Sequence, residues 1–206
     1  MSRYAAVDIG SNSVRIMAAE IGHGETRILA EDLQVTRLGE SVFRGGRISK
    51  AALDLLCATL AKMAAIYGGL DIAGVRAVAT SAVRDASNQA EFLERTRRAL
   101  GTTVEIISGQ EEARLIHLGV KARWPRSRER TLIIDVGGGS AELVLSQNGQ
   151  LIDAVSKPLG AVRLTEMFLK SDPPLADELH RLDGYVREKL APFHRRHGAE
   201  KFDRTL

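Results

Sequence analysis

"TLIIDVGGGSAELVL" at residues 131–145 reads as a buried strand, a tight glycine turn and a second strand. "YAAVDIGSNSVRIMA" at residues 4–18 has the same plan, with an Asp at the end of the strand, a Gly two residues later and small residues as far as a Ser. Glycine lets the backbone approach a ligand closely, and the N–H groups of such a turn can bind phosphate. Each hairpin alone is equally well explained as a plain β-hairpin. Two Asp-led copies predict a pair of phosphate-binding turns, one on each side of an interdomain cleft.

The composition is that of a soluble globular protein, with 206 residues of which 44% are hydrophobic and 27% charged. A formal charge of +3 fits an anionic ligand without requiring nucleic acid, and we expect no nucleic-acid partner. The single cysteine, Cys57, excludes an internal disulfide and favours a reducing cytoplasm. No apolar run reaches the roughly 18 residues of a transmembrane helix, and Asp8 interrupts any signal-peptide core. We therefore expect a cytoplasmic protein without a membrane partner.

The order of the predicted elements indicates an α/β protein with two related halves. The first half is expected to hold strands at 4–9, 13–21 and 26–37, a helix within 48–69, a strand within 74–86 that leads into a polar turn, a helix at 88–100, a strand at 102–108 and a helix at 108–122. Ser49 is the expected N-cap of the first long helix. A charged linker at 123–130, "RWPRSRER", precedes the second hairpin, which is followed by a strand at 150–157 and helices near 161–170 and 175–197. No further strand is evident, so we expect domains at 1–122 and 123–206, with the second one incomplete.

Polar side chains around both turns fit the same chemistry. Four of them can hydrogen-bond a phosphate group: Ser11, Asn12, Ser13 and Ser140. Asp8 and Asp135 end their strands just before the turns, where a carboxylate can hold a divalent cation or orient water. Glu142 lies two residues beyond Ser140, within reach of the same site.

Two adjacent acids begin the helix expected from residue 108. Ser108 and Glu111 have capping-box spacing, which gives Glu111 a structural role. Glu112 shares one helix face with Leu115, Ile116 and Gly119. We expect it to point inward, where desolvation raises the pKa of a carboxyl group and suits a general base.

Other polar residues divide between functional and structural readings. Arg84 falls in a turn between a strand and a helix, where its guanidinium can clamp a phosphate, although most arginines simply lie on the surface. Asn88 and Glu91 have capping-box spacing, so Asn88 is read as structural. His194 and His197 stand among arginines without a companion carboxylate motif, and we expect both to be solvated.

The paired "DIGSNS" and "DVGGGSAE" resemble the phosphate loops of the actin-like ATPase superfamily. The chain is most similar to the exopolyphosphatase and guanosine pentaphosphate phosphohydrolase family within it. Three stretches carry that resemblance: "AAVDIGSNSVRI" at 5–16, "ATSAVRDASN" at 79–88, and "EIISGQEEARLIHLGV" at 105–120 leading to "IIDVGGGSAELV". The resemblance implies an actin-like, ribonuclease H-like α/β fold and release of terminal orthophosphate from polyphosphate or guanosine pentaphosphate.

The resemblance also implies roles for individual residues. Glu112 matches the catalytic glutamate of the family, the second of the adjacent pair. Mg²⁺ or another divalent cation is expected near Asp135 and Glu142. The residues expected to bind phosphate are Asp8, Ser11, Asn12, Ser13, Arg84, Gly137, Gly138, Gly139 and Ser140.

Two other functions share the paired hairpins. A kinase or ATPase of the same superfamily would transfer phosphate from ATP to a metabolite, but it does not explain the stretches around Arg84 and Glu112. A non-catalytic protein that binds polyphosphate or an alarmone would use the turns without turnover. The chain also lacks the family's later Ser-Gly-Thr loop, and a half-built second domain would expose apolar sheet surface. We therefore expect marginal stability and self-association, for example as a swapped homodimer.

Overall fold

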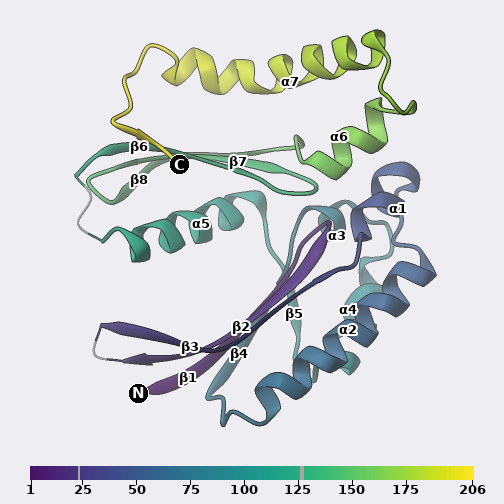
Figure 1. The fold of residues 1–206 in the computed structure, drawn as a ribbon, viewed down its shortest axis with the longest axis vertical. Coiled ribbons are helices and arrows are strands. Elements are labelled where there is room, and N and C mark those ends of the chain that lie inside the picture. Colours follow the sequence, from purple (N-terminus) through teal and green to yellow (C-terminus); the bar gives the residue numbers. More distant parts are fainter. Residues whose placement is uncertain (23, 126–127) are drawn as a thin grey trace. The chain divides into compact units, whose positions relative to one another are not determined.

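Figure 1 shows a computed structural model that describes residues 1–22, 24–125 and 128–206. The chain divides into two compact units, Met1–Ile107 and Ser108–Leu206. This boundary precedes helix α5 (Gly109–Arg123), whereas the sequence placed it after residue 122. The reason is packing, because α5 lies against strands of the second unit. Part of the expected linker, residues 126–127, lies outside the described residues.

In the described part of the first unit, the sheet has the strand order β3-β2-β1-β4-β5. Its first three strands are antiparallel and the other two are added in parallel. The elements are β1 (Ser2–Ile9), β2 (Ser13–Gly22), β3 (Glu25–Val35), α1 (Leu38–Gly45), α2 (Lys50–Gly68), β4 (Gly74–Ala79), α3 (Ser81–Asp85), α4 (Gln89–Leu100) and β5 (Val104–Ile106). Helices α1 and α3 were not predicted. Arg84 therefore lies on a short helix and not in a plain turn.

The core of this unit is aliphatic and lies between one face of the sheet and its helices. Val7, Ile9, Val14 and Ile16 point from β1 and β2 into one cluster, which also contains the buried side chains of α2 and α4. The N-cap prediction for α2 is confirmed, because the Ser49 side chain accepts a hydrogen bond from the N–H of Ala52 at 3.2 Å. Alternation along β1 leaves Asp8 on the other face of the sheet, where it is exposed.

Helix α2 is long and apolar enough, by length and composition alone, to cross a membrane, with a mean hydropathy of 1.4. Lys50, Asp54 and Lys62 interrupt its apolar sequence, so it is not an unbroken apolar run of that length. One face of α2 is buried in the core of the first unit through Leu53, Leu56, Thr59, Leu60 and Met63. Core helices of globular units meet the same criteria, so α2 is explained by its packing.

The described part of the second unit has a sheet in the order β8-β7-β6-β9. Its elements after α5 are β6 (Arg130–Val136), β7 (Ala141–Gln147), β8 (Gln150–Lys157), α6 (Ala161–Phe168), α7 (Ala176–His197) and β9 (Arg204–Thr205). Strand β9 corrects the expectation that no strand follows residue 157. It pairs in parallel with β6, a contact that joins residues more than seventy positions apart and leaves no pattern in so short a segment.

The two units repeat one construction. The strand order β8-β7-β6-β9 of the second unit corresponds to the order β3-β2-β1-β4 of the first. In each unit two helices lie, in sequence, between the third and the fourth of these strands. Even the register agrees. Tyr4 of β1 lies opposite Gly74, the first residue of β4, and its counterpart Thr131 of β6 lies opposite Arg204, the first residue of β9. The prediction of two related halves is therefore visible strand by strand.

Candidate functional site

The turn at residues 10–13 is held from two sides within the first unit. The N–H of Gly10 donates to the carbonyl of Ser13 at 2.9 Å, which closes the turn. The Ser11 hydroxyl accepts a hydrogen bond from the N–H of Ala82 at 3.1 Å, so it takes the place of a side-chain cap on α3. The Asn12 carbonyl accepts the N–H groups of Thr36 and Arg37, both at 2.9 Å. The backbone of this turn is therefore rigidly placed.

Helix α3 brings Arg84 into the same part of the first unit, because the Ser11 bond fixes the start of that helix. Arg84 is half-buried, and its guanidinium donates to the carbonyl of Ile107 at 2.7 Å. Of the predicted phosphate ligands in this unit, Ser11 is buried, Ser13 is half-buried, and Asp8 and Asn12 are exposed. The bond from Ala82 to Ser11 thus attaches the helix that carries Arg84 to the turn.

The glycine turn of the second unit has the same closing bond, from the N–H of Gly137 to the carbonyl of Ser140 at 3.0 Å. Its carbonyls are bound by the start of α6. Gly137 accepts the N–H of Ala161 at 2.9 Å, and Gly138 accepts the N–H of Arg163 at 3.0 Å. The Arg163 guanidinium donates to the Gly139 carbonyl at 2.6 Å. These bonds satisfy first-turn N–H groups of a helix that has no side-chain cap.

Three acids lie at one end of one sheet face in the second unit. Asp135 and Glu142 are directly opposite each other across β6 and β7. They share a face with Ile133 and Val144, which pack against α5. Along α5, Ala113 packs with Ile133 and Val144, and His117, one turn later, contacts Ser146 farther from the glycine turn, so the helix runs away from that turn and Glu112 precedes both contacts. That these acids belong to one site stays a prediction.

The contacts of α5 correct one detail of the prediction for Glu112. The side that packs on the sheet consists of Ala113, Ile116, His117 and Val120, so the predicted Ile116 belongs to it but Leu115 and Gly119 do not. Glu112 therefore flanks the buried side and is half-buried. Its neighbour Glu111 has the structural contacts expected of it. Its N–H is capped by the Ser108 hydroxyl, and its carboxylate binds Arg114 at 2.7 and 2.8 Å.

His117 shows why the packing side of α5 is displaced. Its ring is buried and lies 3.2 Å from the Ser146 hydroxyl on β7. Burial, with Lys121 nearby, lowers the pKa of this imidazole below its usual 6.5, so the neutral ring is accommodated against the sheet. A polar residue can thus occupy a core position that the apolar pattern alone would not assign to it.

Asp135 and Glu142 fit a divalent cation in the way that Mg²⁺ is usually bound. That ion commonly takes one or two carboxylates and completes its shell with water and substrate phosphate oxygens. Glu142 is 2% exposed, and its carboxylate accepts a hydrogen bond from the Ser156 hydroxyl at 2.7 Å. Within the described ranges no cluster of three or more His, Cys, Asp or Glu residues is suited to hold a metal. Two carboxylates alone are therefore the protein's candidate ligands.

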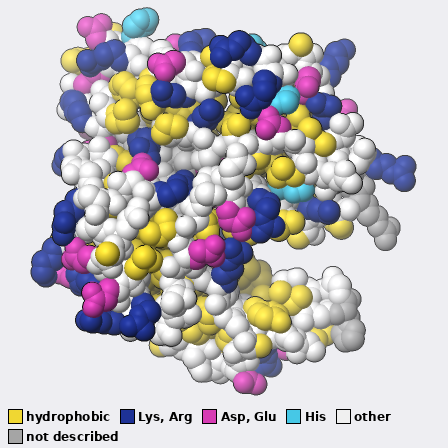
Figure 2. All heavy atoms as spheres, turned by 180° about the vertical axis from the view of Figure 1, so that it is seen from behind, with side chains coloured by type: hydrophobic (Ala, Val, Ile, Leu, Met, Phe, Trp, Pro, Cys, Tyr) yellow, Lys and Arg dark blue, Asp and Glu magenta, His cyan; other side chains and the backbone are white. Residues whose placement is uncertain are grey.

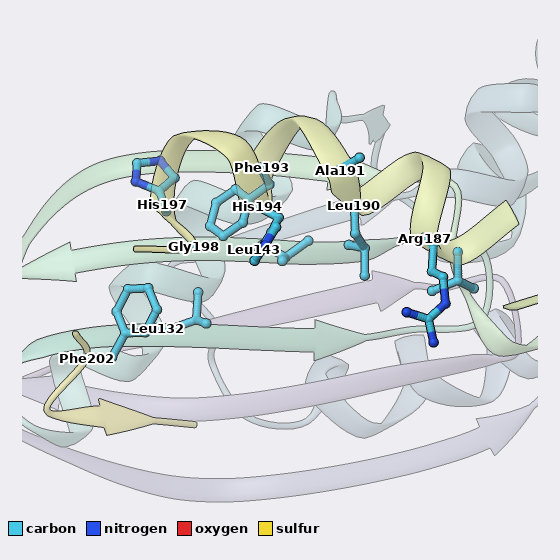
Figure 3. Close-up of a pocket in the computed structure, with 11 residues that line it drawn as sticks. Leu132, Leu143, Arg187, Leu190, Ala191, Phe193, His194, His197, Gly198 and Phe202 are labelled. Atoms are coloured by element: carbon cyan, nitrogen blue, oxygen red, sulfur yellow. The ribbon is translucent and has the colours of Figure 1, made fainter. Parts of the chain in front are cut away.

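The second unit also contains a cavity that does not include the glycine turn. Between α7 and strands β6 and β7 there is a cavity of about 500 Å³ with mostly apolar walls. Figure 3 shows Leu190 and Phe193 on α7 above Leu132 and Leu143 on the strands. None of the described residues around this cavity belongs to the turn 137–140, so it is not the phosphate site. The face in Figure 2 carries charges of both signs scattered among apolar patches, without one dominant basic surface.

Sequence reasoning missed Gly160 and Arg163, which contact the glycine turn. A repeated Leu-Gly pair was the available signal: Leu38-Gly39 and Leu159-Gly160 both stand at the start of the first helix after a third strand. In each unit the N–H groups at this start bind carbonyls of the turn. The Leu-Gly pair therefore marks the segment of the second half that corresponds to the start of α1.

Comparison with known proteins places this construction in a family. The model of the Ppx/GppA phosphatase family matches residues 16–204. "Exopolyphosphatase 2" of Mycobacterium tuberculosis is 34% identical over 201 residues, which cover 93% of this chain and 63% of that protein. The chain thus spans less than two thirds of the length of this relative.

Solved structures agree with the fold. An exopolyphosphatase from Cytophaga hutchinsonii matches with a TM-score of 0.92 at 27% identity, over 99% of this chain and 65% of that one. The Aquifex aeolicus member of the Ppx/GppA family matches with a TM-score of 0.77 at 33% identity, over the same shares of the two chains. The predicted α/β fold is therefore confirmed as the fold of these proteins.

Proposed function

Because the chain belongs to the Ppx/GppA phosphatase family, we propose that it hydrolyses a terminal phosphoanhydride bond and releases orthophosphate from inorganic polyphosphate. The exopolyphosphatase name of the relatives supports the substrate class. The observation that carries the proposal lies in the second unit alone, where Glu112, Asp135 and Glu142 share one end of a sheet face beside the glycine turn. A plain β-hairpin would not require this collection of acids.

The phosphate groups are assigned to the two turns. In the second unit the ligands are the backbone N–H groups and Ser140, and in the first unit they are the turn 10–13, Asp8 and Arg84. Backbone N–H groups suit this task because they present positive charge without being titrated and without reorganising. Arg84 contributes a positively charged guanidinium, which the Ile107 carbonyl holds in place at 2.7 Å.

Glu112 is the proposed general base. Its carboxylate accepts a proton from the attacking water as the water oxygen forms a bond to the terminal phosphorus. The bond from phosphorus to the bridging oxygen breaks, and the shortened chain leaves with the electron pair on that oxygen. A divalent cation held by Asp135 and Glu142 would supply positive charge to the phosphate oxygens. The proposed compartment is a reducing cytoplasm.

Phosphate release tests this proposal. We expect release from polyphosphate by the wild type, and a Glu112→Gln variant slower by about 10²–10⁴-fold with little change in KM. The matched control is Glu111→Gln, which makes the same change one residue earlier on a side chain occupied by Arg114. Equal rates for wild type and Glu112→Gln would remove Glu112 from catalysis.

The substrate panel separates the remaining functions. Guanosine pentaphosphate carries the same kind of terminal bond and is the second substrate to compare, with and without Mg²⁺. ATP together with sugar or acid acceptors tests the kinase function, and a simple phosphomonoester tests specificity for anhydrides. Binding of polyphosphate without turnover, unchanged in Glu112→Gln, would instead indicate a non-catalytic binding protein.

A further inference from the structure

All three carbonyls of the glycine turn point toward the start of α6, because each accepts a hydrogen bond from it. Two of these bonds come from backbone N–H groups, those of Ala161 and Arg163. The third, to Gly139, comes from the Arg163 side chain at 2.6 Å. Arg163 thus binds two successive peptides of the turn, one with its backbone and one with its guanidinium.

The direction of the carbonyls fixes the direction of the N–H groups. In a trans peptide the N–H of the next residue points opposite to the C=O, so the N–H groups of Gly138, Gly139 and Ser140 point away from α6. None of these three groups has a hydrogen-bond partner in the described part of the chain. Gly139 and Ser140 are also buried, and buried N–H groups are rarely left unpaired. Three such adjacent groups form a concave anion-binding nest.

The corresponding third carbonyl of the turn in the first unit is also held by hydrogen bonds. Asn12 is the counterpart of Gly139, and its carbonyl accepts two backbone N–H groups, those of Thr36 and Arg37, at 2.9 Å. In the second unit a single side chain makes the corresponding contact. The Gly139–Ser140 peptide is also able to rotate about its Gly139 side, since Gly139 has no side chain to restrict its backbone.

We propose that Arg163 is a positioning residue for phosphate binding, whose guanidinium holds the Gly139 carbonyl so that the Ser140 N–H faces the bound phosphate. The inference rests on the proposed function, in that the anion is taken to be a phosphate group of the substrate. Arg163 itself donates to the protein and acts through the Ser140 N–H. Loss of the anchor frees this peptide to rotate, and the nest then loses one of its three donors.

The test measures the amide signals of the turn by NMR in the 206-residue chain, titrated with inorganic tripolyphosphate. In the wild type the Gly138, Gly139 and Ser140 amide protons are expected to shift together. In Arg163→Met the Ser140 shift is expected to be lost while the other two persist, and the Kd is expected to rise about 10- to 100-fold, as for one hydrogen bond to a charged group. Arg163→Lys, which keeps a charged donor, is expected to restore the Ser140 shift.

The charge-matched control is Arg187→Met on α7, where the guanidinium is 78% exposed and its partner is the surface Asp183. It is expected to leave all three shifts and the Kd unchanged. An unaltered Ser140 shift in Arg163→Met, or equal loss of all three shifts, would overturn the proposal. If the wild type does not respond to tripolyphosphate, the proposed function fails. In that case amide exchange in the free protein still tests whether Arg163 orients the Ser140 N–H. Faster exchange at Ser140 alone in Arg163→Met supports this role, and unchanged exchange refutes it.

Discussion

Gly160 touches the glycine turn so closely that adding one methyl group should disturb the candidate site. A Cβ at this position would lie 2.3 Å from the backbone nitrogen of Gly139 and 2.4 Å from the carbonyl carbons of Gly138 and Gly139. Real Cβ atoms essentially never approach other atoms within 3.0 Å. The φ of −71° and ψ of 150° at Gly160 are open to alanine, so only this close approach demands glycine.

The size of the effect follows from the displacement. Relieving the contact moves the start of α6 at least 0.7 Å from the turn, the difference between 3.0 and 2.3 Å. A bond of 2.9 Å, such as that from Ala161 to Gly137, would lengthen to about 3.6 Å, beyond hydrogen-bonding range. Overpacking of this kind costs about 1–3 kcal/mol. For a chain of this length, 2 kcal/mol corresponds to a fall in Tm of about 4–8 °C.

Thermal and urea unfolding of Gly160→Ala measure this effect, and tripolyphosphate titration measures its consequence for the turn. The matched control is Gly184→Ala on α7, where an added Cβ meets no atom within 4 Å. Since glycine inside a helix is unfavourable, that variant should be more stable by about 0.5–1 kcal/mol. The reasoning is refuted if Gly160→Ala is as stable as the wild type and binds tripolyphosphate with the same Kd.

Two further changes test contacts that hold each unit together. Asn88→Ala should destabilise the first unit by about 1–3 kcal/mol in urea unfolding, because the buried amide binds both backbone groups of Ile48, at 2.9 and 3.1 Å, and these would lose their partner. Glu178 accepts the N–H groups of Leu175 and Lys170, which lower the pKa of its carboxyl below 4.5. Its contribution to stability is therefore complete above that value and is lost as the pH falls below it, so unfolding midpoints measured from about pH 6 to pH 3 should change less in Glu178→Gln than in the wild type.

Local chemistry was readable from the sequence wherever both partners lie within a few positions. The Ser49 and Ser108 caps are examples, since each hydroxyl binds an N–H three residues ahead. Asn88 shows the limit of this reasoning. Its structural role was anticipated from its spacing to Glu91, but its main contact is the backbone of Ile48, forty residues away. Contacts of that range leave no spacing to recognise.

Tertiary partners also decided which polar residues are buried. His197 was expected in solvent, yet its ring is 13% exposed and lies 2.7 Å from Asp153 and 3.1 Å from Glu200. Burial of Asp153 disfavours its charge, but hydrogen bonds from His197 and Arg196 outweigh this and lower the pKa of the carboxyl below 3.8. Asp153 is on β8, far from His197 in sequence, so the run of arginines near residue 197 could not indicate it.

The difference between the two turns has a physical cause in what lies against each. In the first unit the Ser11 hydroxyl binds the start of α3, so a side chain at that position has a structural use. Its counterpart in the second unit is Gly138, and that turn lies so close to Gly160 that a Cβ on Gly160 would clash with the backbone of Gly138 and Gly139. The third carbonyl is anchored by backbone in one turn and by Arg163 in the other. The two Asp-led hairpins are thus held in place by different contacts. In the glycine-rich copy, the proposed orientation of the Ser140 N–H depends on the side chain of Arg163, which a substitution can remove.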